Sequence, residues 1–160
     1  MAQTNKVNKF PDEKSCGIVL FYENDGSQEN RNDRLERQYL ILHYPGGHFD
    51  FPKGHVEKGE ENDEQTTAAR ELLEETGISD LQFIPGFRSE IFYTYSKNGK
   101  PSFKQVIFFA GKTKSKDVTL SFEHKNFIWL PYKDALKKLT FDNAKNTIKK
   151  VEEFLKLHQK

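Results

Sequence analysis

The sequence contains little cysteine, no long apolar run and no excess of either charge. With Cys16 as its single cysteine, the chain can form neither an internal disulfide nor a cysteine-based zinc site. No apolar segment approaches the length that spans a membrane, and the opening stretch MAQTNKVNKFPDEK has no hydrophobic signal region. We therefore expect a soluble, cytoplasmic protein that has no membrane partner.

The charge balance and the length narrow the class of protein further. Lys and Arg total 25, Asp and Glu total 24, and the net charge is +1. Such a chain lacks the basic excess that binds nucleic acid through bulk charge, so we expect any recognition of phosphate to be local. A length of 160 residues suits one domain. We expect a monomer with a lead over residues 1–13, disordered or forming a cover strand, and a single domain over residues 14–160.

The periodicity of apolar residues predicts strands interleaved with helices. Strand-like runs cover residues 15–22, 39–44, 81–95, 103–112 and 126–132, and the polar segment 23–37 is typical of a loop. The pair Asn98-Gly99 indicates a hairpin. A helix is predicted over residues 64–76, ending at Gly77, and an amphipathic helix at the end of the chain carries Phe141, Ala144, Ile148, Val151 and Leu155. This order favours an α/β layer fold with a mixed sheet between helices.

One segment, FPKGHVEKGEENDEQTTAARELLEETGI, concentrates carboxylates behind two glycines. Helical geometry places Glu71, Glu74 and Glu75 on one face, with Ala69, Leu72, Leu73 and Thr76 on the side that can pack on a sheet. Like charges at this spacing repel each other, and the C-terminal helix dipole disfavours anions. Hard divalent cations such as Mg²⁺ require oxygen ligands. The segment therefore indicates a site that holds metal against phosphate.

These residues resemble the Nudix signature. Gly54 is followed after five residues by Glu60, and RELLEETGI, residues 70–78, matches the second half at every specified position. Nine residues rather than seven separate Glu60 from Arg70. The two additional residues should lengthen the loop or the first helical turn, and either Glu61 or Glu64 could replace Glu60 in joining the loop to the helix.

The resemblance implies a fold, a chemistry and a cofactor. It implies a Nudix-type α/β/α sandwich that hydrolyses a nucleoside diphosphate linked to another group, with Mg²⁺ as the cofactor and Mn²⁺ as a substitute. Glu71, Glu74 and Glu75 are then metal ligands and catalytic residues, and which of them is the general base stays open. The carbonyl of Gly54 joins the metal shell, and Arg70 orients a glutamate through a salt bridge.

Beyond that signature the chain is similar to the asymmetric diadenosine tetraphosphate hydrolases, through GFRSEIFYTY, KQVIFF and LSFEHKNFIWL. This similarity implies hydrolysis of diadenosine tetraphosphate to ATP and AMP. It implies phosphate contacts from His48, Lys53 and Lys104, with Lys100 as the alternative to Lys104. The remaining implied residues are Tyr93 at phosphate or base, Phe127 stacked on adenine, and Glu123 at the metal or in catalysis.

Several alternatives remain open at this level. The same scaffold could remove pyrophosphate from a 5′-phosphorylated RNA end, or act on another nucleoside-diphosphate compound. It could also be an inactive Nudix module that senses a nucleotide or binds a partner. Core packing competes with ligand contact for Phe127 and Tyr93, because both lie in strand-like segments.

Overall fold

The structure is a computed structural model that describes residues 10–23 and 36–158. Within these ranges, eight strands form one sheet, and three helices accompany it. The strands are β1 (Glu13–Glu23), β2 (Arg37–His43), β3 (Phe49–Asp50), β4 (Lys53–His55), β5 (Gln82–Phe83), β6 (Ser89–Lys97), β7 (Lys100–Thr113) and β8 (Asn126–Pro131). The helices are α1 (Glu64–Thr76), α2 (Tyr132–Lys138) and α3 (Asp142–His158).

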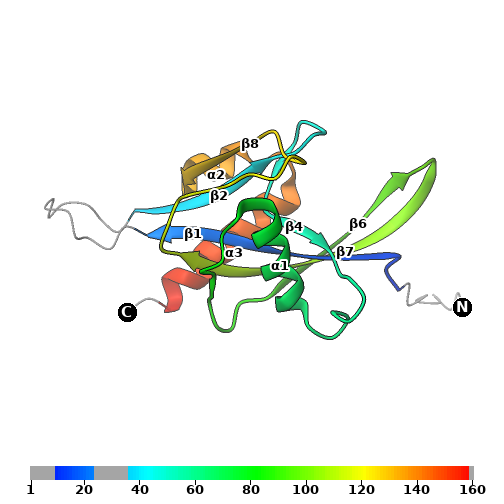
Figure 1. Cartoon of the computed structure of the whole chain (residues 1–160), viewed down its shortest axis with the longest axis horizontal. Helices are drawn as coiled ribbons and strands as arrows, with labels where there is room; N and C mark the ends of the chain where they lie inside the picture. Colours follow the sequence, from blue (N-terminus) through cyan, green and yellow to red (C-terminus); the bar gives the residue numbers. More distant parts are fainter. Residues whose placement is uncertain (1–9, 24–35, 159–160) are drawn as a thin grey trace, which may run out of the picture.

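Strand β1 lies at the centre of the sheet (Figure 1). It runs parallel to β7 and antiparallel to β2 and β4, so the sheet is mixed, as predicted. Strand β8 extends the sheet beyond β2, and β6 pairs with β7 in a hairpin that projects from the body of the protein. The run SCGIVLF becomes the central strand because both of its faces are covered, which suits a continuous apolar sequence.

Two apolar clusters lie on opposite faces of the sheet, because alternate strand residues point to opposite sides. On one face, Ile18 and Leu40 pack with Ala68 and Leu72 of α1. On the other face, strand residues such as Val19 and Ile41 pack with α2, its C-cap residue and α3, whose core residues are Ala135, Leu139, Ala144, Ile148, Val151 and Leu155. This arrangement is the predicted α/β/α sandwich.

The strand predicted over residues 81–95 is interrupted. Pro85 and Gly86 divide it into β5 and β6, and Gly86 has a φ of 88°, in the left-handed region that favours glycine. The predicted hairpin is confirmed, because Asn98 and Gly99 both have positive φ, at 52° and 77°. Most of the predicted loop 23–37, and the lead through residue 9, lie outside the described residues. None of the helices in the described ranges is long and apolar enough to cross a membrane.

Candidate active site

Helix α1 carries the three predicted metal-binding carboxylates and is capped at both ends. The Asp63 carboxylate accepts hydrogen bonds from the backbone N–H and the hydroxyl of Thr66, at 3.1 and 2.7 Å. At the other end Gly77 adopts a left-handed φ of 73°, and its N–H donates to the carbonyl of Leu73 at 2.8 Å. These caps satisfy backbone groups that a helix end otherwise leaves unpaired. The predicted bounds of this helix, 64–76, are confirmed.

The three carboxylates differ in how deeply they are buried. Glu75 is 6% exposed, because it follows Leu72 by three residues and so lies on the face that packs against the sheet. The side chain of Glu71 is 14% exposed and that of Glu74 is 56% exposed. The prediction that Leu73 packs on the sheet is wrong: Leu73 is half exposed, and Glu75 occupies the buried side.

Strand β4 lies directly against these carboxylates. A Cβ atom built on Gly54 would lie 1.9 Å from the carboxylate carbon of Glu71, so any larger residue at this position would displace that carboxylate. The backbone N–H of Lys53 donates to the carboxylate of Glu75 at 3.2 Å. The first glycine of the signature is therefore required because the backbone of β4 approaches the helix so closely.

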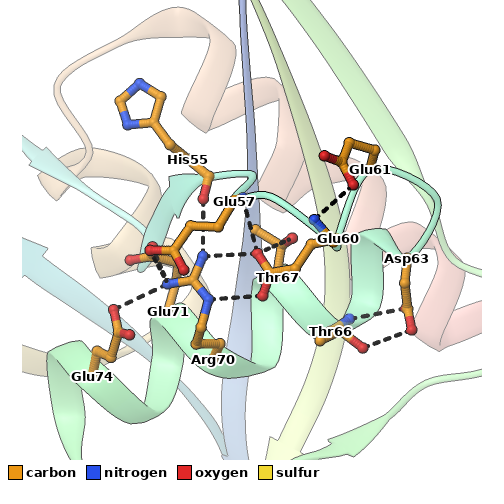
Figure 2. A network of polar contacts seen from close by, with 11 residues as sticks. His55, Glu57, Glu60, Glu61, Asp63, Thr66, Thr67, Arg70, Glu71 and Glu74 are labelled. Carbon is orange, nitrogen blue, oxygen red and sulfur yellow. Dashed lines mark hydrogen bonds and ion pairs between the residues drawn. The ribbon is translucent and has the colours of Figure 1, made fainter.

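Arg70 connects the loop before α1 to the carboxylates (Figure 2). Its guanidinium donates to both oxygens of Glu60, at 2.8 and 3.0 Å, and to the carbonyl of His55 at 2.9 Å. It also reaches Glu71 at 2.8 Å and Glu74 at 3.1 Å. Arg70 thus forms the salt bridge with a glutamate that the signature implies.

The longer spacing after Glu60 leaves its predicted contact to the helix intact. Glu60 also accepts hydrogen bonds from the hydroxyl of Thr67 and the N–H of Glu57, both at 3.0 Å, and these donors together with Arg70 lower the pKa of Glu60 to about 2. Glu61 instead accepts from the N–H of Gly59. Neither Glu61 nor Glu64 therefore replaces Glu60, and the nine-residue spacing is accommodated in the turns before Asp63 and the start of α1.

Glu64 lies two turns before Glu71 on the same side of the helix, but it has different partners. Its two carboxylate oxygens pair with Arg88 at 2.8 and 2.9 Å, and with Lys14 at 2.8 Å. These contacts tie α1 to β1 and to the segment before β6. Glu64 therefore has a structural role, separate from the carboxylates farther along the helix.

The buried carboxylates lie in an environment that disfavours their negative charge. Burial, followed by repulsion from Glu71, raises the pKa of Glu75 to about 9. Burial also raises the pKa of Glu71, against the opposing effect of Arg70. His124 lies 3.8 Å from Glu75, but burial lowers the pKa of this imidazole, so it is a weak source of compensating charge.

This pair of carboxylates suits a divalent cation in its chemistry. A hard cation accepts carboxylate oxygens and would add positive charge beside Glu75 and next to the Arg70–Glu71 pair. Across residues 10–23 and 36–158, no three His, Cys, Asp or Glu side chains are grouped closely enough to enclose a metal ion. Arg70 holds Glu71 and Glu74 in this arrangement. A cation would therefore compete with Arg70 for these two carboxylates.

A cleft of about 750 Å³ opens over the carboxylates. It brings together every site residue predicted from the sequence except Phe127. The residues concerned are His48, Lys53, Gly54, Glu71, Glu74, Glu75, Tyr93, Lys104 and Glu123. The cleft therefore has an acidic wall formed by α1 and Glu123, and a basic wall formed by two lysines.

The two lysines differ in how their charge is compensated. Lys53 pairs with the buried Asp50 at 2.7 Å, and although burial opposes its charge, this carboxylate raises the pKa of Lys53. Lys104 lies opposite Tyr93 in the hairpin, and burial followed by repulsion from Lys53 lowers its pKa. No salt bridge to Lys104 occurs in the described parts of the chain. Its ammonium group is thus available to a bound anion.

An apolar cavity of about 570 Å³ adjoins this basic wall. It shares four residues with the polar cleft, namely His48, Lys53, Tyr93 and Lys104. Its apolar and aromatic lining consists of Ile91, Tyr93, Tyr95, Phe108, Phe141 and Ala144. Binding sites with such linings accept a flat aromatic ligand, and a few polar groups then fix its orientation.

The structure places Phe127 apart from both cavities. Phe127 is partly buried, pairs with Leu42 across β2 and β8, and packs against the cluster under α1. It is absent from the lining of either cavity. One of the aromatic rings that do line the apolar cavity is Phe141, which is half exposed and lies 5.3 Å from the ring of His48.

Sequence reasoning assigned Phe141 to the core stripe of the last helix. Helix α3 begins at Asp142, and the carbonyl of Phe141 accepts the N–H of Lys145 at 3.1 Å, so Phe141 lies at the cap position. A cap residue has non-helical backbone angles, and its side chain therefore leaves the helical stripe. The run LTFDN contains a signal for this helix start, because Asp142 is an acidic residue at the first helical position.

The chain is similar to known proteins over most of its length. The NUDIX domain model matches residues 9–151. The asymmetrical bis(5′-nucleosyl)-tetraphosphatase of Rattus norvegicus is 36% identical over 148 residues, which cover 89% of this chain and 95% of that protein. The enzyme of the same name from Caenorhabditis elegans is 32% identical, with coverages of 89% and 96%.

A solved structure gives the same result for the fold. The crystal structure of a C. elegans Ap4A hydrolase binary complex has a TM-score of 0.73 and 31% sequence identity, and covers 90% of this chain and 98% of its own. The arginine-linked carboxylates of α1, the glycine of β4 and these similarities lead to one conclusion: the chain belongs to the NUDIX family and is a hydrolase.

Proposed function

We propose that this protein hydrolyses dinucleoside polyphosphates, with diadenosine tetraphosphate as the main substrate and a divalent cation, Mg²⁺, as the cofactor. The observation that carries the proposal is that the two cavities adjoin each other. A polar cleft lined by glutamates and lysines shares His48, Lys53, Tyr93 and Lys104 with an apolar, aromatic cavity. A polyphosphate with an attached nucleoside presents the same sequence of chemistry, from charged phosphate to flat base.

The basic wall would bind the phosphates beside the nucleoside. Lys104 has a lowered pKa and no salt-bridge partner among the described residues, so an anion close to it favours its charged form. Lys53 is preoriented by Asp50, and His48 closes the same side of the cleft. Tyr93 lies between both cavities and can contact phosphate through its hydroxyl or the base through its ring.

The acidic wall would act at the bond that is cleaved. A divalent cation bound there neutralises phosphate charge and lowers the pKa of a bound water. Glu71 and Glu75 are the buried carboxylates facing this position, and Glu74 and Glu123 lie at its rim. Arg70 holds Glu71 at 2.8 Å and so positions one carboxylate relative to the substrate.

The reaction adds one water across one phosphoanhydride bridge. The water oxygen bonds to one of the two phosphorus atoms of that bridge. The bond between this phosphorus and the bridging oxygen breaks, and the bridging oxygen leaves with the other product. Asymmetric cleavage of the tetraphosphate yields ATP and AMP. The enzymes of Rattus norvegicus and Caenorhabditis elegans that carry the name "asymmetrical" support this regiochemistry.

One assay tests the proposal against its alternatives. The full chain is incubated with Mg²⁺ and, in separate reactions, diadenosine tetraphosphate, 5′-triphosphorylated RNA and nucleoside triphosphates, and the products are resolved by chromatography. We expect ATP and AMP from the first substrate at the highest kcat/KM. Two molecules of ADP would exclude asymmetric cleavage. A higher kcat/KM on RNA would favour the RNA-end activity, and inactivity on all substrates would favour a sensor.

A further inference from the structure

Phe122 is the most exposed large apolar side chain in the described part of the protein. It is 97% exposed, and it directly precedes Glu123, which lines the polar cleft. Transfer of a phenyl ring from water to an apolar surface is strongly favourable. Among the described residues, no aromatic ring or cation packs on this side chain. The fold therefore gains little from this phenyl group, which is adjacent in the chain to a residue that lines the cleft.

The turn that carries Phe122 is held in place by several hydrogen bonds. The N–H of His124 donates to the carbonyl of Ser121 at 3.2 Å, and the Ser121 hydroxyl lies 3.0 Å from Nδ1 of His124. The N–H of Ser121 donates to the carbonyl of Glu75 at 3.0 Å. The imidazole of His124 also makes an edge contact with the ring of Tyr44. The ends of the turn are thus anchored to the active site itself.

The position of this turn relative to the two cavities indicates what it can contact. The apolar cavity meets the polar cleft at the lysine side, through Lys53 and Lys104. Glu123 and Glu74 line only the polar cleft. A linear ligand with one base in the apolar cavity therefore runs past the lysines and leaves at the acidic end, beside Glu123. A dinucleotide has a second base at that end, whereas a mononucleotide has none.

We propose that Phe122 stacks on the base of the second nucleoside of a dinucleoside polyphosphate and thereby makes the enzyme select dinucleotides over mononucleotides with equally many phosphates. This inference rests on the proposed function. An exposed aromatic ring on a rigid turn suits this purpose because every base has a flat π face, and stacking requires no preformed hydrogen-bond pattern. Phe122 is thus a specificity residue and takes no part in bond cleavage.

The experiment compares two substrates and three variants. The substrates are diadenosine tetraphosphate and adenosine 5′-tetraphosphate, which has the same number of phosphates and lacks the second base. In Phe122→Ala we expect the ratio of kcat/KM for the dinucleotide to that for the mononucleotide to fall about tenfold, equal to about 1.4 kcal/mol. Phe122→Trp should retain the ratio. Phe10→Ala removes another exposed ring, 86% exposed and outside both cavities, and is the matched control.

The result can contradict the inference in two ways. An unchanged ratio in Phe122→Ala, or an equal loss on both substrates, would exclude stacking on the second base. Calorimetric titration with methylene-bridged, non-hydrolysable analogues of both nucleotides separates this inference from the proposed function. If the wild-type chain cleaves neither substrate, a selective loss of dinucleotide-analogue binding in Phe122→Ala still supports the inference. Equal binding by Phe122→Ala and the wild-type chain would overturn it.

Discussion

Two carboxylates with little exposure, Glu75 and Glu13, show how differently this protein treats negative charge in two regions. The Glu13 side chain is 10% exposed and accepts hydrogen bonds from Tyr95, from Lys97 and from Ser102 near the turn of the β6–β7 hairpin. These contacts, led by that of Lys97, lower its pKa well below the ordinary value. Glu75 has one backbone donor, and its pKa rises to about 9.

The two carboxylates serve different purposes, because the contacts of Glu13 hold the hairpin in place and those of Glu75 leave its charge poorly compensated. At the hairpin every oxygen of the carboxylate is matched by a donor, which fixes Tyr95 in the wall of the apolar cavity. On α1 Glu75 has one backbone donor and an imidazole of lowered pKa 3.8 Å away, so its charge is poorly compensated, at a cost to folding that a metal ion can remove. A buried acid with few donors is thus a more informative sign of a site than an acid with many donors.

The largest expected effect is a loss of turnover when Glu75 is substituted. Glu75→Gln removes the negative charge but retains the shape and the acceptor for the N–H of Lys53. Without that charge the affinity for the cation and the organisation of the reacting phosphate fall, so we expect kcat to drop by about 1,000-fold. Steady-state hydrolysis of diadenosine tetraphosphate with saturating Mg²⁺ measures this. Near-normal turnover would remove Glu75 from the site.

The same substitution should stabilise the metal-free protein. Because the pKa of Glu75 is raised from 4.5 to about 9, the folded state binds one more proton than the unfolded state between these values, and the wild-type chain loses stability as pH rises through that range. Glu75→Gln should abolish this loss, with a gain on the order of 2 kcal/mol, or about 4–8 °C in Tm, at pH 8. Thermal melts in EDTA at pH 5 and pH 8 should show the gain chiefly at pH 8.

Substitution of two phenylalanines should distinguish a ring that binds ligand, Phe141, from a ring that packs in the core, Phe127. Phe141→Ala should raise KM for diadenosine tetraphosphate about tenfold with a small change in Tm, because its ring lines the apolar cavity and is half exposed. Phe127→Ala should instead lower the free energy of unfolding by about 2 kcal/mol, because the ring packs on the cluster under α1. Kinetics and melts of both variants, side by side, would reveal a reversal of these roles.

Substitution of Glu13 should change the free energy of unfolding by less than substitution of Glu75, and in the opposite direction. Glu13→Gln retains one acceptor but loses the charged contact with Lys97, so we expect a loss of about 1 kcal/mol in the free energy of unfolding at pH 7. Because the folded-state pKa of Glu13 is lowered, its contribution is present above the unfolded value of 4.5 and is lost as pH falls below that. Urea melts at pH 7 and pH 3.5 should therefore differ from wild type mainly at pH 7.

Local signals in the sequence were sufficient to predict helix α1 and its connection to the preceding loop. Helix 64–76 was predicted to the residue because both of its caps, Asp63 and Gly77, are adjacent to it in the chain. A salt bridge from Arg70 to a glutamate also followed from the signature, and the structure identifies Glu60 as the glutamate that joins the loop to the helix. Even the unusual spacing between these two residues left the contact unchanged, because the extra length lies in turns before the helix.

What the sequence could not supply was the orientation of elements against one another. Helical spacing places Glu71, Glu74 and Glu75 near one another, but the sheet decides which of them is buried. Phe127 and Phe141 both follow apolar patterns, and only the start of α3 shows that Phe141 is outside the buried stripe. Periodicity assigns a face to a residue, whereas the cavity beside that face results from long-range packing.

The close approach of β4 to α1 has a consequence for engineering and for natural variation. At position 54 a single methyl group would occupy the space of the Glu71 carboxylate, so one added carbon atom is enough to disorganise the acidic wall. Gly54 lies in β4, and the three atoms nearest to the added methyl group all belong to the Glu71 side chain, so the direct clash is with the acidic wall. This position is therefore where a folded chain that retains the lysine wall and the aromatic cavity could be turned into a nucleotide-binding protein without hydrolysis.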